Sequence, residues 1–190
     1  MGKLVLSMFM SLDGYIEKPS GFVGPSWSDD LERHWSGHAL SRAKHLVYGR
    51  KNFLFNKAFW SAADTDPASP AASIAYAGTM NRLPKTVFST TLAGDPGWNA
   101  TLAGGDVASV IADLKRDIDG DIFSFGGAGL ANSLVRADVV DEYRLMITPN
   151  LFGDGKRLFT GGLPEIDLRL IDTLPLDTGA VILRYARARG

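Results

Sequence analysis

The apolar residues of this chain fall into short runs whose spacing alternates between strand-like and helix-like. Segments rich in apolar residues predict buried strands at residues 3–11, 45–48, 85–89 and 121–125. Behind Asp106, four apolar residues recur at helical spacing, namely Val107, Val110, Ile111 and Leu114, which predicts a capped helix. Further helices are expected after Ser28, after Gly49, over residues 71–81 and over residues 130–136.

The last third of the chain is dominated by strand patterns. Residues 139–148 predict a long strand with Tyr143, Leu145 and Ile147 directed inward, and residues 168–174 and 180–187 predict an antiparallel hairpin. A short strand is expected at 98–102 and an irregular segment at 58–70. Strands that alternate with helices and end in a hairpin indicate an α/β fold with a mixed sheet covered on both faces. We find no repeat or linker, so one domain over residues 1–190 is expected.

The most informative segment runs from residue 121 to residue 130, where an apolar strand pattern leads into glycines and then into a helix pattern. Such a turn leaves backbone N–H groups unpaired at a helix N-terminus, where the helix dipole favours an anion. Glycines at 126, 127 and 129 would let a phosphate approach the main chain. The alternative is a tight strand-to-helix turn without a ligand.

Two further strand ends carry groups that suit a nucleotide. The second strand leads into Arg50 and Lys51, and the third leads into Ser89, Thr90 and Thr91. Basic and hydroxyl groups at strand ends can bind the ribose 2′-phosphate that NADP has and NAD lacks. The alternative for Arg50 and Lys51 is a solvated helix start. The glycine turn lacks the third glycine of a dinucleotide fingerprint and the lysine of a phosphate loop.

Composition narrows the classes of function. The formal net charge of −1 over 190 residues provides no field that would favour nucleic acid or an acidic membrane. The absence of cysteine excludes disulfides, thiolate zinc sites and cysteine nucleophiles, and it is compatible with a reducing compartment. No apolar run approaches membrane-spanning length. We therefore expect a cytoplasmic protein that acts on a small molecule, with no nucleic-acid or membrane partner.

Several motifs together resemble one family. In order along the chain they are SLDGYI at 11–16, GRK at 49–51, KTVFSTTL at 85–92, FGGAGL at 125–130, DEYRL at 141–145 and PNLFGDGKRLF at 149–159. This series is similar to the dihydrofolate reductase-like group that includes the reductase domain of the bacterial bifunctional riboflavin-biosynthesis deaminase–reductase. The resemblance covers nearly the whole chain, in the right order.

The resemblance implies a three-layer α/β/α dihydrofolate reductase-like fold with about eight strands, NADPH as the hydride donor, and a homodimer. It implies that residues 49–52 meet the pyrophosphate and adenosine end of the cofactor, that 89–91 meet its 2′-phosphate, and that 126–130 hold its pyrophosphate. It also implies that residues 13–16 line the nicotinamide and the substrate mouth. The implied cofactor-binding residues are Gly49, Arg50, Lys51, Asn52, Ser89, Thr90, Thr91, Gly126, Gly127, Ala128, Gly129 and Leu130.

The chain also departs from the family pattern. Asn52 stands where dihydrofolate reductases and many relatives have threonine, and the zinc-ligand cysteines of the deaminase half are missing. Residues 53–60 replace the phosphate-gripping run of the riboflavin reductases. These departures favour stand-alone relatives over enzymes with a phosphoribosyl substrate.

The candidates for the chemistry are two carboxylates and several apolar groups. The segment 27–31 resembles the dihydrofolate reductase helix whose carboxylate binds the pterin edge; Asp30 is the aligned residue, and it can accept paired hydrogen bonds from a 2-amino-4-oxo ring. Asp13 is the second catalytic candidate. The alternatives are a favourable helix-dipole contact for Asp30 and a turn role for Asp13. The candidate substrate contacts are Tyr15, Ile16, Trp27 and Phe53, although Phe53 also fits the core.

These observations predict an NADPH-dependent reductase of a small pterin- or pyrimidine-like heterocycle, or of a related carbonyl or imine. Dihydrofolate reductase activity and a nucleotide-binding protein without turnover are the alternatives. No metal site is expected, because the His34 and His38 pair lacks the acidic neighbour of a zinc helix motif.

Overall fold

An eight-stranded mixed sheet forms the centre of the computed structural model, which describes residues 1–65 and 71–188. Its strand order is β10-β11-β8-β1-β7-β4-β5-β6. The strands are β1 (Lys3–Ser11), β4 (Ala43–Gly49), β5 (Lys85–Phe88), β6 (Ala100–Ala103), β7 (Asp121–Phe125), β8 (Glu142–Thr148), β10 (Leu168–Pro175) and β11 (Val181–Arg187). Strands β8 to β6 run parallel, whereas β11 pairs antiparallel with both β8 and β10.

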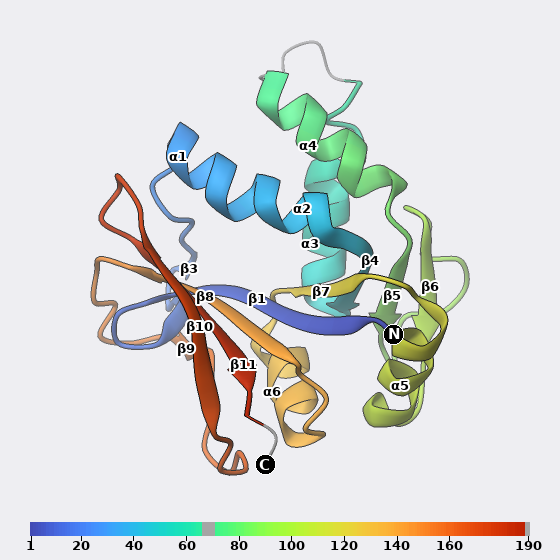
Figure 1. Cartoon of the computed structure of the whole chain (residues 1–190). Helices are drawn as coiled ribbons and strands as arrows, with labels where there is room; N and C mark the ends of the chain where they lie inside the picture. Colours follow the sequence, from blue (N-terminus) through green and yellow to red (C-terminus); the bar gives the residue numbers. More distant parts are fainter. Residues whose placement is uncertain (66–70, 189–190) are drawn as a thin grey trace.

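Helices cover both faces of this sheet (Figure 1). On one face lie α1 (Asp29–Leu31), η1 (Glu32–Gly37), α2 (His38–Arg42), α3 (Arg50–Trp60) and α4 (Ala71–Arg82); on the other lie α5 (Val107–Asp117) and α6 (Ala128–Arg136). Each face of the sheet has its own hydrophobic core, because successive side chains of a strand point to opposite faces. Val5 and Phe123 pack toward α3 and α4, whereas Leu4 and Ile122 pack toward α5 and α6. The predicted three-layer α/β/α fold with a C-terminal antiparallel hairpin is therefore confirmed.

Most predicted elements are present, and the differences lie at their ends. Helix α3 continues to Trp60 into the segment expected to be irregular, helix α6 begins two residues early at Ala128, and β8 begins at Glu142 rather than at 139. Residues 61–65 of the predicted irregular segment form turns, and its last part, residues 66–70, lies outside the described residues. Three short strands were not predicted: β2 (Tyr15–Lys18), β3 (Gly21–Phe22) and β9 (Lys156–Arg157) form a small second sheet. Pairs of two to four residues are too short for a period-two pattern.

Two ionisable side chains are buried at the amino ends of β4 and β5. The Lys85 ammonium donates to the carbonyls of Met80 at 2.6 Å and Leu83 at 2.7 Å, so it satisfies the end of α4. His45 Nε2 lies 2.8 Å from Thr86 Oγ1, and burial, with the charge of Lys85 in second place, lowers the pKa of His45 from 6.5 to about 4. His45 is therefore neutral in the folded protein at neutral pH.

We expect His45 to make the folding stability fall between pH 6.5 and pH 4. In this window the unfolded chain protonates at His45 while the folded chain does not, so the free energy of unfolding decreases as the pH falls and levels off below the folded pKa. The loss should be roughly 2 kcal/mol. Urea unfolding at pH 7 and pH 4.5 measures it.

The control is the wild-type protein at the same two pH values. Carboxylates also titrate in this window, so the prediction concerns the difference between the two proteins: His45→Gln should flatten the pH dependence of the free energy of unfolding. An equal slope in wild type and His45→Gln would contradict the assignment.

None of the helices in the described residues combines the length and the apolar character that a membrane crossing requires.

Candidate functional site

Three predicted strand ends meet at one edge of the sheet. Strands β7, β4 and β5 are parallel neighbours, and Gly49 is level with Phe88 while Val47 is level with Ser124. The turns after these strands therefore emerge side by side. The sheet brings together Gly49-Arg50, Ser89 to Thr91, and Gly126-Gly127, as the arrangement of parallel strands requires.

A cleft of about 380 Å³ opens at this edge, beyond β5 and β6. Four of the residues predicted to bind the adenosine end line it, namely Arg50, Ser89, Thr90 and Thr91. Its remaining walls come from Phe88 and from the segment that leads into α5: Ala103, Gly104, Gly105 and Val107. This last segment was not predicted from the sequence. The glycine pair directly before the capped helix was the one feature that could have indicated it.

The polar groups of the cleft are mostly hydrogen-bond donors. Ser89 Oγ accepts from Thr91 N at 3.2 Å and Leu92 N at 2.8 Å, so its hydroxyl hydrogen is left to donate. The Arg50 guanidinium has neither an ion pair nor a hydrogen bond within the part of the chain that the structure describes. Asp106, which lies between the lining residues Gly105 and Val107, accepts from Ser109 N at 2.9 Å as the cap of α5. An anionic group fits this set.

The glycine turn after β7 has a backbone that disfavours other residues. Gly126 has φ +81° and Gly127, the N-cap of α6, has φ +88°. No side chain caps α6, so its first N–H groups are available to a ligand. A Cβ at position 126 would lie 2.6 Å from Asn52 Nδ2, which donates to the carbonyl of Phe125. Asn52 therefore ties α3 to the turn.

The other predicted cofactor residues differ in accessibility. Lys51 is exposed but does not line the cleft, and Gly129 is exposed in the first turn of α6. Ala128 and Leu130 are buried against the sheet, and the Cβ of Leu130 would lie 3.4 Å from a Cβ at Gly49. An alanine at position 49 would therefore make an ordinary van der Waals contact with α6.

Asp13 holds two segments together. Its carboxylate accepts from Ser11 Oγ at 2.5 Å, Phe152 N at 3.0 Å and Gly153 N at 2.7 Å. The Ser11 hydrogen bond, supported by the two backbone donors against some desolvation, lowers the pKa of Asp13 to about 2. Asp13 is therefore ionised at neutral pH and cannot serve there as a proton donor. It anchors the loop after β8 to the turn after β1.

Asp30 lies in the first turn of the helix that Ser28 caps, with Ser28 Oγ accepting from Leu31 N at 3.1 Å. One Asp30 oxygen accepts from Asp177 N at 3.1 Å and the other lies 3.5 Å from His34 Nε2. The carboxylate is partly exposed and has further acceptor capacity. The helix thus carries a carboxylate held from two sides, and Trp27, which precedes the helix in the sequence, is exposed.

Phe53 needs correction as a substrate contact. Its side chain has no exposed surface, and its ring packs 5.7 Å from Trp98 and 6.2 Å from Tyr48 in the core. Ile16 is likewise buried, whereas Tyr15 is partly exposed and carries Arg157 over its ring.

Exposed aromatic rings lie elsewhere. Phe22, 54% exposed, contacts Phe9 of β1 at 5.6 Å and Phe55 of α3 at 5.7 Å. Phe55 is 57% exposed, and it comes three residues after Asn52 on the same helix. Phe9 and Phe22 were not predicted as part of an aromatic surface, because only the fold brings β1, β3 and α3 together.

Among the described residues, histidines and carboxylates do not gather in groups of three or more that could hold a metal ion.

Comparisons with known proteins agree with this architecture. A family model described as the RibD C-terminal domain matches residues 2–182. Two uncharacterized proteins of Bacillus subtilis (strain 168) are each 27% identical: YyaP over 184 residues, covering 96% of this chain and 94% of its own, and YwjB over 189 residues, covering 98% of both.

Solved structures agree as well. A Shewanella sp. PV-4 protein, provisionally named for riboflavin biosynthesis, has a TM-score of 0.74 at 23% identity, with full coverage of both chains. A Thermotoga maritima diaminohydroxyphosphoribosylaminopyrimidine deaminase/5-amino-6-(5-phosphoribosylamino)uracil reductase has a TM-score of 0.69 at 16% identity, covering 98% of this chain and 57% of its own. At these identities the structural likeness establishes the fold.

Proposed function

The chain belongs to the RibD C-terminal domain family, and we propose that it is an NADPH-dependent reductase acting on a small pterin- or pyrimidine-like heterocycle, or on a related carbonyl or imine. Membership of this family supports a reductase of the riboflavin-pathway type.

The observation that carries the proposal is the donor-rich cleft beside the glycine turn. Arg50 and the hydroxyls of Ser89, Thr90 and Thr91 face one cavity and suit a 2′-phosphate. The uncapped N-terminus of α6, behind Gly126 and Gly127, suits a pyrophosphate at the same sheet edge. These residues fit the two charged parts of NADPH, which when bound would supply the hydride. The protein's own contribution is to orient the cofactor and the acceptor.

Exposed aromatic rings and one carboxylate favour a flat acceptor. Phe22 and Phe55 present half-exposed rings next to Phe9, and a planar heterocycle can stack on such rings. Asp30, as a carboxylate, can accept paired hydrogen bonds from an aminopyrimidine edge. Because Asp13 is held ionised by three donors, its role in this proposal is to fix the loop at the substrate mouth.

The basic side chains near the substrate mouth argue against a phosphorylated acceptor. Lys156 pairs with Glu17 at 3.3 Å, Arg157 stacks on Tyr15, and Lys18 lies 4.9 Å from the centre of the Phe152 ring. All three are engaged within the small sheet and its loop. Dihydrofolate reductase activity is the second candidate, and the carboxylate of Asp30 is the observation that favours it.

Calorimetric titration with NADPH and, in parallel, NADH tests the cofactor. We expect tight binding that is selective for NADPH.

A turnover experiment then tests the acceptor. The protein with bound NADPH is offered dihydrofolate, a dihydropterin, and aminopyrimidine ribosides with and without a 5′-phosphate, and oxidation of the cofactor is followed by the loss of its near-ultraviolet absorbance. Oxidation by an unphosphorylated heterocycle supports the proposal. Binding without oxidation by any acceptor would indicate a nucleotide-binding protein without turnover, and absence of binding would overturn the reductase assignment.

A homodimer and a cytoplasmic location complete the proposal. The edge strand β10 exposes Leu168, Leu170 and Ile171, and the unpaired backbone groups of an exposed apolar edge strand can pair with another chain. Sedimentation at micromolar concentration tests the dimer.

A further inference from the structure

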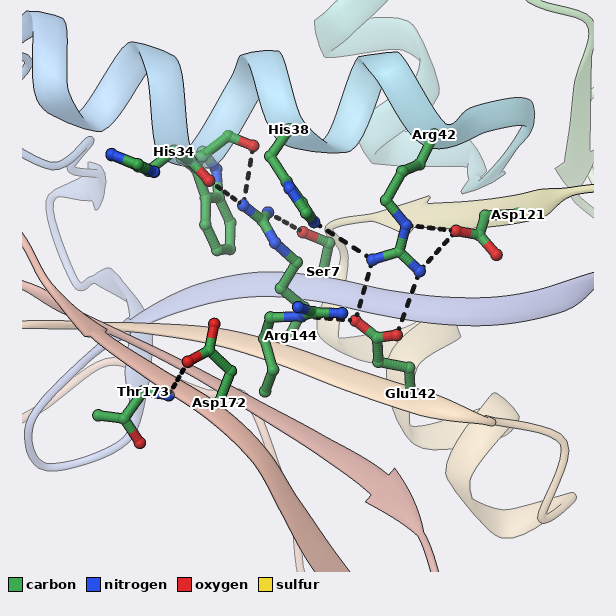
Figure 2. A network of polar contacts seen from close by, with 11 residues as sticks. Ser7, His34, His38, Arg42, Asp121, Glu142, Arg144, Asp172 and Thr173 are labelled. Atoms are coloured by element: carbon green, nitrogen blue, oxygen red, sulfur yellow. Dashed lines mark hydrogen bonds and ion pairs between the residues drawn. The ribbon is translucent and has the colours of Figure 1, made fainter.

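The helix that carries Asp30 contains a π-helical segment, η1, and a buried arginine is inserted against it (Figure 2). Arg144 of β8 is 1% exposed, and its Nη2 donates to the carbonyls of His34 at 2.5 Å and Trp35 at 2.9 Å. Its Nη1 donates to Ser7 Oγ at 3.1 Å, and the guanidinium lies 4.1 Å from the centre of the Trp35 ring. Arg144 therefore connects η1 to the middle of the sheet.

The π geometry and the arginine belong together. In η1, the N–H of His38 donates to the carbonyl of Arg33, five residues back, and also to that of Trp35. This wider turn leaves the carbonyl of His34 without the donor that a regular α-helix would supply from residue 38. Arg144 supplies that donor from outside the helix. Single π turns occur frequently at functional sites.

The surroundings of Arg144 do not suit a residue that only stabilises the fold. The neighbouring carboxylate Glu142 is paired with Arg42, and so is Asp121 (Figure 2). Glu142 is also paired with Arg184. Within the described residues Arg144 forms no ion pair, and its Nε has no hydrogen-bond partner. A buried cation that forms no ion pair is costly for folding.

The contacts of Arg144 lead directly to Asp30. His34, whose carbonyl Arg144 holds, places its Nε2 3.5 Å from Asp30 Oδ1. A π turn contains one residue more than the α turn it replaces, so loss of η1 would rotate the preceding helix by about 100° relative to α2. Such a rotation would carry Asp30 away from its present direction.

We propose that Arg144 is a positioning residue, which fixes the direction of the Asp30 carboxylate toward the acceptor by holding η1 in its π form. This inference rests on the proposed function, in which Asp30 binds the acceptor. Arg144 acts through the His34 and Trp35 carbonyls and does not itself contact the acceptor or the cofactor.

The test uses two variants. Arg144→Met keeps the side-chain bulk and removes the hydrogen-bond donors, and Arg144→Lys keeps the positive charge but lacks the paired N–H donors of a guanidinium. Arg184→Met is the matched control, because it removes an arginine of the same network and leaves Glu142 paired with Arg42. Amide hydrogen exchange over residues 29–42 reports on η1 whether or not the enzyme assignment is right. Faster exchange there is expected in Arg144→Met and not in Arg184→Met.

Kinetics with the acceptor identified by NADPH oxidation gives the second readout. For Arg144→Met, kcat/KM for the acceptor should fall about 30-fold while the NADPH dissociation constant stays within about twofold, with partial recovery in Arg144→Lys. The double variant Arg144→Met/Asp30→Asn should lose no more kcat/KM than Asp30→Asn alone, because both substitutions remove the same interaction between Asp30 and the acceptor.

Two results would overturn the positioning role. One is unchanged exchange over η1 in Arg144→Met; the other is additive losses in the double variant. If none of the acceptors oxidises the NADPH bound to the wild-type protein, the proposed function fails and Asp30 has no acceptor to face, so the positioning role falls with it; the exchange data then show separately whether Arg144 maintains η1.

Discussion

Replacing Arg50 with alanine is expected to raise the NADPH dissociation constant about 30-fold and to leave that of NADH within about twofold. The guanidinium lines the cleft with Ser89, Thr90 and Thr91 and has no partner within the described residues, so its charge is available to a phosphate. A charge-assisted hydrogen bond to an ionised group contributes about 1.5–3 kcal/mol, and only NADPH carries the 2′-phosphate. Parallel calorimetric titrations of both cofactors measure the difference.

Lys51→Ala is the matched control for Arg50→Ala. Lys51 is the next residue, is exposed and carries the same charge, but it does not line the cleft. Its removal should weaken NADPH binding by no more than about threefold through the loss of long-range attraction. The salt dependence should separate the two variants. Arg50→Ala removes a cation that binds the phosphate directly, so NADPH binding to this variant should weaken less steeply as salt is added. Equal losses for NADPH and NADH in Arg50→Ala would remove the 2′-phosphate assignment.

The strand ends of the site could be predicted because each one is marked locally. An apolar run followed by glycine, hydroxyl or basic residues needs no information from elsewhere in the chain, and parallel strands then bring such ends to one edge. The third wall of the cleft was not predictable in this way. Gly104 and Gly105 become part of the cleft only because β6 pairs with β5, which places them opposite Ser89.

The burial of Arg144 could not be predicted from the sequence. The alternation in β8 predicts that Tyr143 and Leu145 face inward, and both are buried. The same alternation makes Arg144 a residue of the other face, and charged residues on alternate positions usually meet water. In this fold the other face is covered by η1 and α2, so Arg144 is buried as well. When helices cover both faces of a sheet, neither face meets solvent, so alternation along a strand no longer separates buried from exposed residues.

Phe53 and Phe55 show why the sequence could offer Phe53 as a substrate contact. Both are aromatic and belong to the same helix, and their sequence positions alone do not say which one faces the sheet. Phe53 packs into the core, and Phe55 projects toward Phe22. Helical position decides exposure only when the direction of the core is known.

Gly126→Ala is expected to destabilise the protein by about 2–3 kcal/mol and to weaken NADPH binding at least about 10-fold. Two effects combine at this position. The backbone has φ +81°, which costs an L-residue about 1–2 kcal/mol, and the new Cβ would lie 2.6 Å from Asn52 Nδ2. Relief of that contact requires Asn52 to release the carbonyl of Phe125, which frees the turn that is proposed to hold the pyrophosphate.

Gly94→Ala separates these two effects, because Gly94 has φ +76° but a Cβ there would meet nothing within 4 Å. It should therefore lose only the backbone contribution, about 1–2 kcal/mol, and bind NADPH normally. Urea unfolding and NADPH titration of both variants provide the comparison. Because the two glycines share a left-handed backbone, any excess loss in Gly126→Ala measures the contact with Asn52. If the two variants lost the same stability and Gly126→Ala still bound NADPH as wild type does, the glycine turn would be a structural turn and would not serve as a phosphate site.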